Sequence, residues 1–483
     1  MAHNDYENKL NSWIEDEKAA LAIINNVGQL WFNKSVELVL FRNQLVDRSA
    51  SQIMNLHEYG KNTIKQTIGV QDTLAVIAAL SALDNLAPSK IDVGKLTAEW
   101  LAEKTNYASI TEFLTTKLAS FLGDDVAHIT PKDVVLYGFG RIGRLAAREL
   151  IAQAGKGEQL RLRAIVTRGN SAEEIIKRAD LLRTDSVHGP FPGTVIEDTA
   201  NSALIINGHT VHMIDAKNPE DVDYTKYGIN NALLIDNTGV FRNRAELGRH
   251  LQAKGIDKVL LTAPAADIPN VVHGVNHEKT EIKEEKIFSA ASCTTNAIMP
   301  ILHVMDTEFG IAKGHIETIH SYTNDQNLLD NYHKKYRRGR SAAINMVITE
   351  TGAESALKKV LPHLSGKFTA NSVRVPTPNV SLAILNLNIN KEVTAEQVND
   401  TVRKYALQGA LVEQIQYAHS NELVSSDVIG NPCPSVFDSQ ATIVSPDKKS
   451  AVLYVWYDNE YGYTRQVMRF AKHIAGVVRL RYY

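Results

Sequence analysis

Two reactive side chains in this sequence have neighbours that suit them for covalent chemistry. Cys293 lies in Ala291-Ser292-Cys293-Thr294-Thr295-Asn296, between the strand-like run 287–289 and a helix-forming segment. Backbone N–H groups and the dipole at a helix start stabilise a thiolate. His320 ends a second β-like run, 316–320. An imidazole beside the thiol would raise the thiolate fraction and move protons. Each residue alone also suits an inert structural role.

A glycine-rich turn upstream indicates a dinucleotide. The strand-like run 134–137 leads into Gly138-Phe139-Gly140-Arg141-Ile142-Gly143, and a helical pattern follows. Glycines at this spacing let a pyrophosphate approach the backbone at a helix start. The same spacing occurs in ordinary turns, but the strand before it and the helix after it favour dinucleotide binding. Thiol, imidazole and dinucleotide together predict covalent hydride transfer from an aldehyde.

Candidate anion ligands lie further along the chain. Arg338 belongs to the basic cluster 334–340, and Arg374 precedes Val375-Pro376-Thr377-Pro378. Guanidinium groups match phosphate oxygens, although a solvated loop or a subunit contact would explain such a cluster equally well. Thr351-Gly352 opens a helical stretch and could form a phosphate nest.

Composition limits the class of protein. The chain has 483 residues, of which 44% are hydrophobic and 22% charged, with a net charge of −2. These values are typical of a soluble globular protein and give no general attraction to nucleic acid or to anionic membranes. We expect neither a transmembrane helix nor a signal peptide. Cys293 and Cys433 are the two cysteines, which favours a cytoplasmic, reducing location without a disulfide framework.

Two regions differ in their patterns. Residues 1–130 show apolar side chains at helical spacing, which predicts an all-α extension of four to six helices, and residues 123–131 suggest a linker. From residue 132 strands and helices alternate, which predicts an α/β fold with a mostly parallel sheet. Longer strands after Cys293 predict a second domain with a mixed or antiparallel sheet. The predicted strands are 134–137, 162–166, 233–236, 259–262, 315–322, 372–375, 381–388 and 450–457, and the predicted helices are 141–154, 172–182 and 463–478.

Four motifs in residues 132–483 resemble those of phosphorylating glyceraldehyde-3-phosphate dehydrogenase. They are the glycine-rich turn 138–144, the cysteine segment 291–296, Arg374-Val375-Pro376-Thr377-Pro378-Asn379-Val380-Ser381 and Trp456-Tyr457-Asp458-Asn459-Glu460. The resemblance implies a Rossmann-type dinucleotide-binding domain over 131–292, an α+β catalytic domain over 293–462, and a C-terminal helix over 463–483 that returns to the dinucleotide-binding domain.

The resemblance also implies residue roles. Cys293 would form a thiohemiacetal and then a thioester, His320 would act as acid and base, and inorganic phosphate would release an acyl phosphate. No metal site is expected. The implied ligands of substrate and phosphate are Ser292, Thr294, Thr323, Asp325, Arg338, Thr351, Gly352 and Arg374. The implied dinucleotide contacts are Gly138, Phe139, Gly140, Arg141, Ile142, Gly143, Thr167, Arg168, Thr238, Gly239, Thr262, Asn459 and Tyr463.

Departures from the family pattern concern the cofactor. NAD-using members carry an acid at the end of the second strand, whereas this chain has Thr167-Arg168 there; many also have Leu-Pro where this chain has Asn331-Tyr332. Both changes favour NADP, used at least comparably to NAD, because an arginine suits a 2′-phosphate. A loop that still accepts NAD is the alternative. Tyr137 replaces an asparagine common before the first glycine.

Three functions remain open at this point. The first is reversible oxidative phosphorylation of D-glyceraldehyde 3-phosphate in glycolysis or gluconeogenesis, by a homotetramer. The second is erythrose-4-phosphate dehydrogenase, against which Arg338 and Thr351-Gly352 count. The third is regulation or partner binding through residues 1–130. That extension carries 16 acidic and 11 basic residues, which argues against nucleic-acid binding there.

Overall fold

A computed structural model describes residues 2–123, 126 and 129–483. The chain forms two compact units. The first unit contains Met1–Pro131 together with two short later segments, Ala154–Gln159 and Gly476–Tyr483. The second unit contains Lys132–Gln153 and Leu160–Ala475. The predicted linker lies partly outside the described residues, because 124, 125, 127 and 128 are not among them.

The first unit is mainly helical, as predicted. Three of its helices begin at a side chain that accepts hydrogen bonds from N–H groups of the first turn, namely Ser49, Asp92 and Ser109, and Ser49 forms a capping box with Gln52. Apolar stripes from these helices, including Ile23, Ile77 and Phe113, make one buried core. The helices are α1 (Ala2–Lys34), α2 (Ala50–Tyr59), α3 (Val70–Ser81), α4 (Val93–Glu103) and α5 (Ile110–Lys117).

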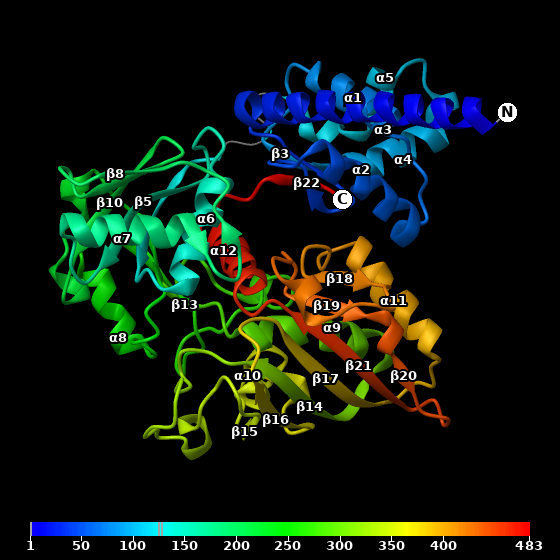
Figure 1. The fold of residues 1–483 in the computed structure, drawn as a ribbon. Coiled ribbons are helices and arrows are strands. Elements are labelled where there is room, and N and C mark those ends of the chain that lie inside the picture. Colours follow the sequence, from blue (N-terminus) through cyan, green and yellow to red (C-terminus); the bar gives the residue numbers. More distant parts are fainter. Residues whose placement is uncertain (1, 124–125, 127–128) are drawn as a thin grey trace. The chain divides into compact units, whose positions relative to one another are not determined.

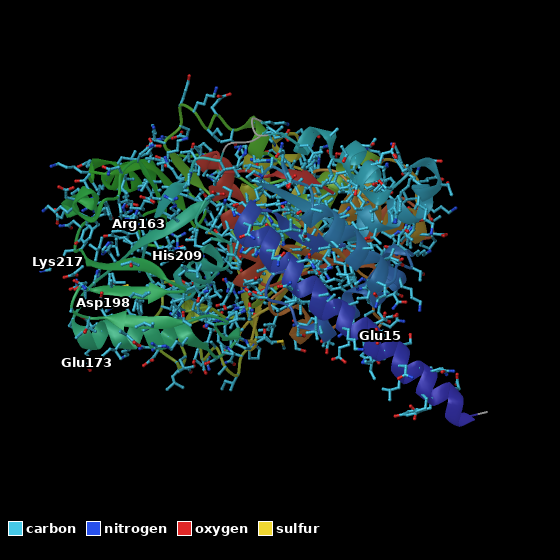
Figure 2. All side chains as sticks on the ribbon, turned by 90° about the horizontal axis from the view of Figure 1, so that it is seen from above. Glu15, Arg163, Glu173, Asp198, His209 and Lys217 are labelled. Carbon is cyan, nitrogen blue, oxygen red and sulfur yellow. The ribbon has the colours of Figure 1, made fainter. Side chains whose placement is uncertain are left out.

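Helix α1 is buried over only part of its length. Its second half contributes Ala20, Ile23 and Leu30 to the core of the first unit. Its first half is mostly exposed, and the turns before Glu15 project beyond the neighbouring helices (Figure 2), while the Glu15 carbonyl oxygen accepts a hydrogen bond from the Gln71 side chain on α3 at 2.9 Å. Trp13 is 53% exposed there. Packing therefore fixes the second half of α1, and the first half extends from it.

The structure adds a small sheet that the prediction of an all-α extension did not foresee. Its strand order is β2-β1-β3-β22, and both β1 and β22 pair with β3 in parallel. Each of these strands is only two to four residues long, which is too short to show the alternation that predicts a strand. They are β1 (Glu37–Leu40), β2 (Asn43–Gln44), β3 (Ser89–Asp92) and β22 (Leu480–Tyr482).

The C-terminal helix is shorter than expected. The interpretation of 463–483 as one helix is corrected, because α12 (Tyr461–Ala475) ends before Gly476. Gly476 has a φ of 70°, the left-handed conformation in which a glycine ends a helix. Helix α12 packs against α6 (Arg141–Ala152), where Arg465 and Tyr461 contact Glu149. The residues after Gly476 belong to the first unit instead.

The first sheet of the second unit is mostly parallel, as the alternation of strands and helices predicted. Its order is β13-β12-β11-β4-β5-β10-β9-β8, with β8 and β9 antiparallel at one edge. Helices α6 and α7 (Ala172–Arg183) lie beside it (Figure 1). The strands are β4 (Lys132–Tyr137), β5 (Leu160–Thr167), β8 (Val195–Asp198), β9 (Ala203–Ile206), β10 (His209–Asp215), β11 (Ala232–Asp236), β12 (Ile256–Leu261) and β13 (Ile287–Ser289).

The second sheet of this unit is mixed, also as predicted. Its order is β15-β16-β14-β17-β21-β19-β18, and β20 pairs with β21. Helix α9 (Cys293–Phe309) packs on it, and its Ile298 and Leu302 belong to the same buried core as Leu385 and Val455 of the sheet. The strands and remaining helices are β14 (Ile311–Ser321), β15 (Val347–Thr349), β16 (Phe368–Val375), β17 (Ser381–Ile389), β18 (Ile415–Ala418), β19 (Ser435–Asp438), β20 (Ile443–Val444), β21 (Ser450–Tyr457), α10 (Ala353–Val360) and α11 (Ala395–Leu407).

Candidate active site

The glycine-rich turn has the geometry that a pyrophosphate requires. Gly138 has a φ of 95°, a conformation that side chains disfavour. A Cβ on Gly143 would lie 2.4 Å from the Gly138 carbonyl oxygen, so α6 can pack this closely on β4 only with glycine there. A Cβ on Gly140 would meet no atom within 4 Å, which leaves open space at the start of α6. These residues therefore fit a dinucleotide phosphate.

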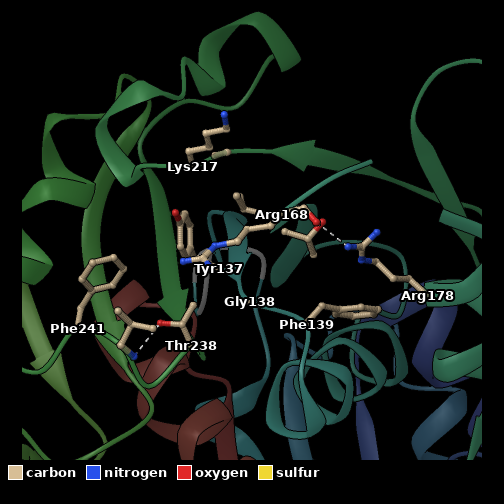
Figure 3. A pocket seen from close by; sticks show the side chains of 12 residues that line it. Tyr137, Gly138, Phe139, Arg168, Arg178, Lys217, Thr238 and Phe241 are labelled. Atoms are coloured by element: carbon tan, nitrogen blue, oxygen red, sulfur yellow. Dashed lines mark hydrogen bonds between the residues drawn. The ribbon is translucent and has the colours of Figure 1, made fainter. Parts of the chain in front are cut away.

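A cavity of about 360 Å³ lies at the ends of β4 and β5 (Figure 3). Five of the predicted dinucleotide contacts line it. Aromatic side chains and three cationic side chains complete its wall. Its lining residues include the predicted Gly138, Phe139, Thr167, Arg168 and Thr238, together with Arg178, Lys217 and Phe241. The apolar wall and the cations suit an adenosine with attached phosphate.

Cys293 is the first residue of α9. Ser292 caps this helix by accepting a hydrogen bond from the Thr295 N–H group. Ala291 has a φ of 55°, an uncommon conformation for a residue with a side chain, so the backbone is strained just before the thiol. Ser292 and Ala291 thus set the position from which Cys293 enters the helix.

His320 lies within reach of Cys293. The Cys293 Sγ and His320 Nε2 atoms are 3.6 Å apart. The His320 Nδ1 atom is 2.7 Å from the Ser321 carbonyl oxygen. Arg374 Nη1, which can only donate, lies 3.1 Å from Nδ1, but the contact with the carbonyl is shorter. We therefore assign the proton to Nδ1, which leaves Nε2 free to accept the thiol proton. The predicted thiol–imidazole pair is present in the structure.

The electrostatics of the pair differ from the expectation. Burial, and to a smaller extent the Arg374 guanidinium, lower the pKa of His320 to about 3, so the imidazole is neutral at neutral pH. Burial raises the pKa of the Cys293 thiol, while Arg374 and the N–H group of Thr294 oppose this shift. The helix start therefore does not by itself produce a thiolate, because loss of water outweighs it. A neutral base beside a thiol suits proton transfer during attack.

Two cavities meet at this pair. One, of about 460 Å³, is rich in cations and hydroxyls, and its lining includes Ser292, Thr294, Arg338, Thr351, Gly352, Arg374, Lys335 and Lys359. The other, of about 700 Å³, is lined among others by Gly140, Arg141, Ile142, Thr238, Thr262, Thr323, Asn459 and Tyr463. Cys293 and His320 line both cavities.

The cationic cavity has donors ready for an anion. Arg374 Nε is buried and makes no hydrogen bond. Arg374 Nη1 donates to the Ser321 carbonyl oxygen, at 3.0 Å. Arg338 is held by Asp325 and by the Thr349 hydroxyl. An unpaired buried guanidinium N–H is costly, and a bound anion would satisfy it.

Comparisons with known proteins agree with this geometry. Two family models match: "Glyceraldehyde 3-phosphate dehydrogenase, NAD binding domain" over residues 132–244 and "Glyceraldehyde 3-phosphate dehydrogenase, C-terminal domain" over residues 292–459. The chain is 48% identical over 456 residues to a glyceraldehyde-3-phosphate dehydrogenase-like protein of Pseudomonas aeruginosa, covering 93% of this chain and 98% of that protein.

Other relatives match a smaller share of this chain. The glyceraldehyde-3-phosphate dehydrogenase of Priestia megaterium is 40% identical over 339 residues, covering 70% of this chain and 96% of that protein. Glyceraldehyde-3-phosphate dehydrogenase 1 of Bacillus subtilis is 40% identical over 344 residues, covering 71% and 98%. This chain belongs to the glyceraldehyde-3-phosphate dehydrogenase family. The family's dinucleotide-binding domain supports a nicotinamide dinucleotide as cofactor.

These relatives differ in whether they share the N-terminal extension of this chain. The match to the Pseudomonas aeruginosa protein covers 93% of this chain, so it must include most of the extension. The Priestia megaterium protein is covered almost completely by 70% of this chain. At least one relative therefore shares the extension, and others do without it. Among the described residues, no helix is both long and apolar enough to span a membrane.

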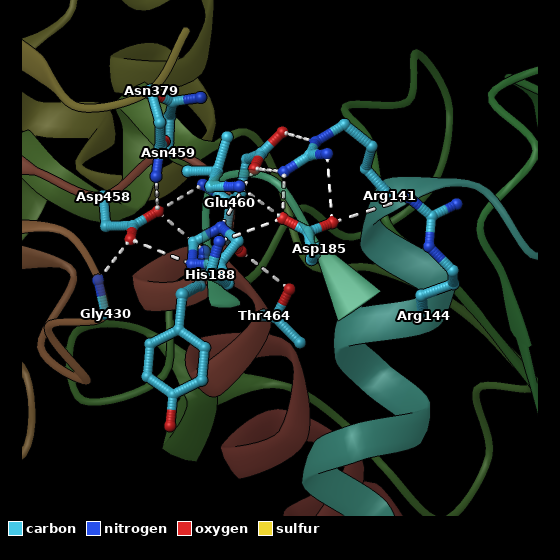
Figure 4. Close-up of polar contacts among 12 residues, drawn as sticks. Arg141, Arg144, Asp185, His188, Asn379, Gly430, Asp458, Asn459, Glu460 and Thr464 are labelled. Carbon is cyan, nitrogen blue, oxygen red and sulfur yellow. Dashed lines mark hydrogen bonds and ion pairs between the residues drawn. The ribbon is translucent and has the colours of Figure 1, made fainter. Parts of the chain in front are cut away.

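A polar network holds the family's Asn459 segment in place (Figure 4). The Ser381 hydroxyl donates to Asn459 Oδ1 at 3.0 Å, which leaves the Asn459 amide N–H₂ to donate. Glu460, the next residue, pairs with Arg141 and accepts from His188. Burial opposes ionisation, but the bonds from His188 and Arg141 lower the pKa of Glu460.

Arg141 thus has a different role from a free phosphate ligand. Its guanidinium also pairs with Asp185, at 3.1 Å, so two carboxylates already neutralise it. Ion pairs from Arg141 therefore connect the start of α6 to Glu460, next to Asn459. Gly239 lines neither neighbouring cavity, and its carbonyl accepts from Arg242. Asp325 likewise lines neither of the two cavities that meet at Cys293, and it forms an ion pair with Arg338.

Sequence reasoning missed several lining residues of this glyceraldehyde-3-phosphate dehydrogenase family site. Arg178 lies in the predicted helix 172–182 but was not singled out, because a cation on a helix usually faces solvent. Lys217 follows the end of β10, and no motif marks it. Lys359 and Arg242 lie outside the four motifs. These residues, with Asn237 and Ser372, line the cavities in the structure.

Proposed function

We propose that this protein catalyses the reversible, phosphate-dependent oxidation of D-glyceraldehyde 3-phosphate to 1,3-bisphosphoglycerate. The observation that carries the proposal is the Cys293–His320 pair, 3.6 Å apart, between a cavity rich in cations and a cavity continuous with the glycine-rich turn. The reaction needs a nucleophile, a base, two phosphate subsites and a hydride acceptor at one point. The proposal includes a homotetramer, the family's common assembly, and a role in glycolysis or gluconeogenesis.

Cys293 and His320 carry the covalent steps. The thiol gives its proton to His320 Nε2 as Sγ attacks the aldehyde carbon. His320 returns the proton to the new oxyanion, which completes a thiohemiacetal. His320 then removes the hydroxyl proton as the thioester forms. A neutral imidazole, with a pKa of about 3, can accept these protons at neutral pH.

The dinucleotide supplies the hydride acceptor when it is bound. Gly138, Gly140 and Gly143 would cradle its pyrophosphate, and the Asn459 amide would orient its carboxamide. Tyr463, whose hydroxyl donates to the Ala291 carbonyl at 2.8 Å, would support the ring next to Cys293. Gly143 and Tyr463 lie in helices, and the other residues lie in short turns between packed elements, which limits the freedom lost on binding.

The cationic cavity would bind the phosphate groups. Arg374 would hold the substrate phosphate, assisted by Thr323, and Arg338 with Thr351 and Gly352 would hold the attacking phosphate. Attack by inorganic phosphate on the thioester carbon breaks the C–S bond and returns the thiolate of Cys293. These donors favour this reaction over erythrose-4-phosphate dehydrogenase, which relies less on an attacking phosphate.

The cofactor proposed is NADP, used at least comparably to NAD. Thr167 and Arg168 stand where an acid would repel a 2′-phosphate, and both line the adenosine cavity. A positive cavity attracts the extra phosphate.

Initial rates test the function directly. Purified protein is assayed with D-glyceraldehyde 3-phosphate and each dinucleotide, with and without inorganic phosphate. We expect turnover that depends on phosphate, with NADP at least equal to NAD. Turnover of erythrose 4-phosphate without phosphate, and none of glyceraldehyde 3-phosphate, would favour the alternative.

A further inference from the structure

We propose that Arg178 is a specificity-determining residue that binds the 2′-phosphate of an adenosine nucleotide, together with Arg168. The proposal deepens the proposed function, because it assigns part of the cofactor cavity. Its ligand class is a nucleotide that carries phosphate on the 2′-hydroxyl of adenosine. Arg178 lies on α7, eleven residues after the end of β5 at Thr167.

Arg178 has bonding capacity that the protein does not use. Its Nη2 donates to the Arg168 carbonyl at 3.0 Å. Its Nη1 is buried and has no hydrogen-bond partner. The nearest carboxylate oxygen, Glu174 Oε1, is 3.8 Å from Nη2. Since an unpaired buried N–H costs free energy, an anion that bound this guanidinium would remove that cost.

The loop before α7 is fixed in place. The Gly169 N–H group donates to Asp215 Oδ1 at 2.7 Å, and the Asn170 amide donates to the Met213 carbonyl at 3.2 Å. Gly169 has a φ of 82°, which glycine adopts without strain. The Ser171 N–H and hydroxyl groups both donate to Glu174 Oε2. The carbonyl that orients Arg178 is therefore part of a rigid loop.

The cavity next to this loop is positively charged. Arg168, Arg178 and Lys217 line it, and no acidic residue does so among the described residues (Figure 3). Tyr137, Phe139 and other apolar side chains form the rest of the wall. The division into an apolar wall and a cationic edge fits an adenine with a phosphate on its ribose.

The three cations are not equivalent. Arg168 and Lys217 are exposed. The Arg178 side chain is 19% exposed and already hydrogen-bonded to the loop. A pre-ordered guanidinium loses less conformational entropy on binding than an exposed chain. Arg178 should therefore contribute more to 2′-phosphate affinity than Lys217.

Asp215 supports an alternative, in which this edge of the cavity binds an adenosine whose 2′-hydroxyl carries no phosphate. It lies beside Thr167 in the β5–β10 register and could accept from a free ribose hydroxyl, as NAD offers. Its Oδ1 is occupied by the Gly169 N–H group. The alternative predicts that the cavity prefers a nucleotide without the 2′-phosphate.

Calorimetry on the full-length protein tests the proposal with two probes. Adenosine 2′,5′-bisphosphate carries the 2′-phosphate, and adenosine 5′-monophosphate lacks it. We expect the wild type to prefer the bisphosphate. Arg178→Ala should weaken bisphosphate binding about 10- to 100-fold and change monophosphate binding less than about threefold, as one charge-assisted contact predicts. Arg178→Lys should restore part of the loss.

The matched control is Lys177→Ala, which removes an exposed cation from the same helix. It should leave both affinities nearly unchanged. A wild type that prefers the monophosphate, or an Arg178→Ala variant that loses both probes equally or neither, overturns the proposal. The test needs no turnover. Bisphosphate preference in a protein that does not oxidise glyceraldehyde 3-phosphate would remove the proposed function and leave the Arg178 site standing.

Discussion

The two units of this chain build their sheets differently. In the second unit each sheet is made of strands from one continuous part of the sequence, before or after Cys293. In the first unit, β3 pairs with β22, which lies almost at the other end of the chain. Cys293, His320 and the cavities between the glycine-rich turn and Arg374 all belong to the second unit. The first unit therefore depends on the end of the chain for its structure, and the chemistry does not lie within it.

Charges are also used differently in the two units. In the first unit, Arg479 next to β22 makes a buried ion pair with Glu37, at 3.2 Å, and lies over the Trp31 ring. Burial lowers the pKa of Arg479. In the second unit, buried Arg374 and Arg178 keep N–H groups unpaired at cavities. Arg479 Nε is also buried without a hydrogen-bond partner, so an unpaired N–H alone does not distinguish the units. The difference is that Arg479 pairs with Glu37 and lies over Trp31, whereas Arg374 and Arg178 line cavities.

The largest effect is expected from Cys293→Ser. A serine hydroxyl is a far weaker nucleophile than a thiol or thiolate near neutral pH, so dehydrogenase activity should be abolished. Dinucleotide binding should remain nearly intact, because the glycine-rich turn is unchanged. Steady-state assays and calorimetric titration measure the two. Substantial turnover by the serine variant would disprove the covalent mechanism.

His320→Asn should lower activity about 10²–10⁴-fold, the usual effect of losing a positioned acid–base group. Wild-type His320 is neutral above about pH 3, so it can take the thiol proton throughout the neutral range. Without that acceptor, the apparent pKa of the Cys293 thiol should rise. Alkylation rates measured against pH test this. An unshifted profile would show that His320 does not act on Cys293.

Arg479→Ala should destabilise the first unit by about 1.5–3 kcal/mol, the loss of one charge-assisted bond, because Lys90, 3.3 Å from Glu37, still compensates that carboxylate. Urea unfolding, followed by fluorescence of Trp31 and Trp100, would report on that unit. The control is Arg481→Ala, which changes an exposed position on β22 and should have a smaller effect. No measurable effect of Arg479→Ala would mean that this end of the chain contributes little to the first unit, and the contrast between the units would disappear.

Arg168→Asp should move cofactor preference toward NAD by about 10- to 100-fold in relative kcat/KM, since a charge-assisted contact is exchanged for repulsion. Steady-state kinetics with both dinucleotides measure this ratio. Stability of the first unit should not change. Strong NAD preference in the wild type, unaltered in the variant, would contradict the NADP assignment.

Much of the second unit could be predicted because its signals are local. Glycines at 138, 140 and 143 obey steric limits within one turn, and the alternation of strands and helices gives the parallel sheet. The small sheet of the first unit could not be predicted in this way. Strands of two to four residues carry too little periodicity, and the choice of β22 as partner for β3 depends on contacts far apart in sequence.

The sequence by itself determined the family resemblance and the mainly helical character of the extension, and it indicated the proposed nucleophile. The tertiary structure decided the 3.6 Å separation of Cys293 and His320, because that distance depends on how α9 packs on the sheet containing β14. It also decided that burial outweighs the helix start in setting the pKa of Cys293. The unpaired Nη1 of Arg178 has the same origin, since whether a cation has a partner depends on every element packed around it.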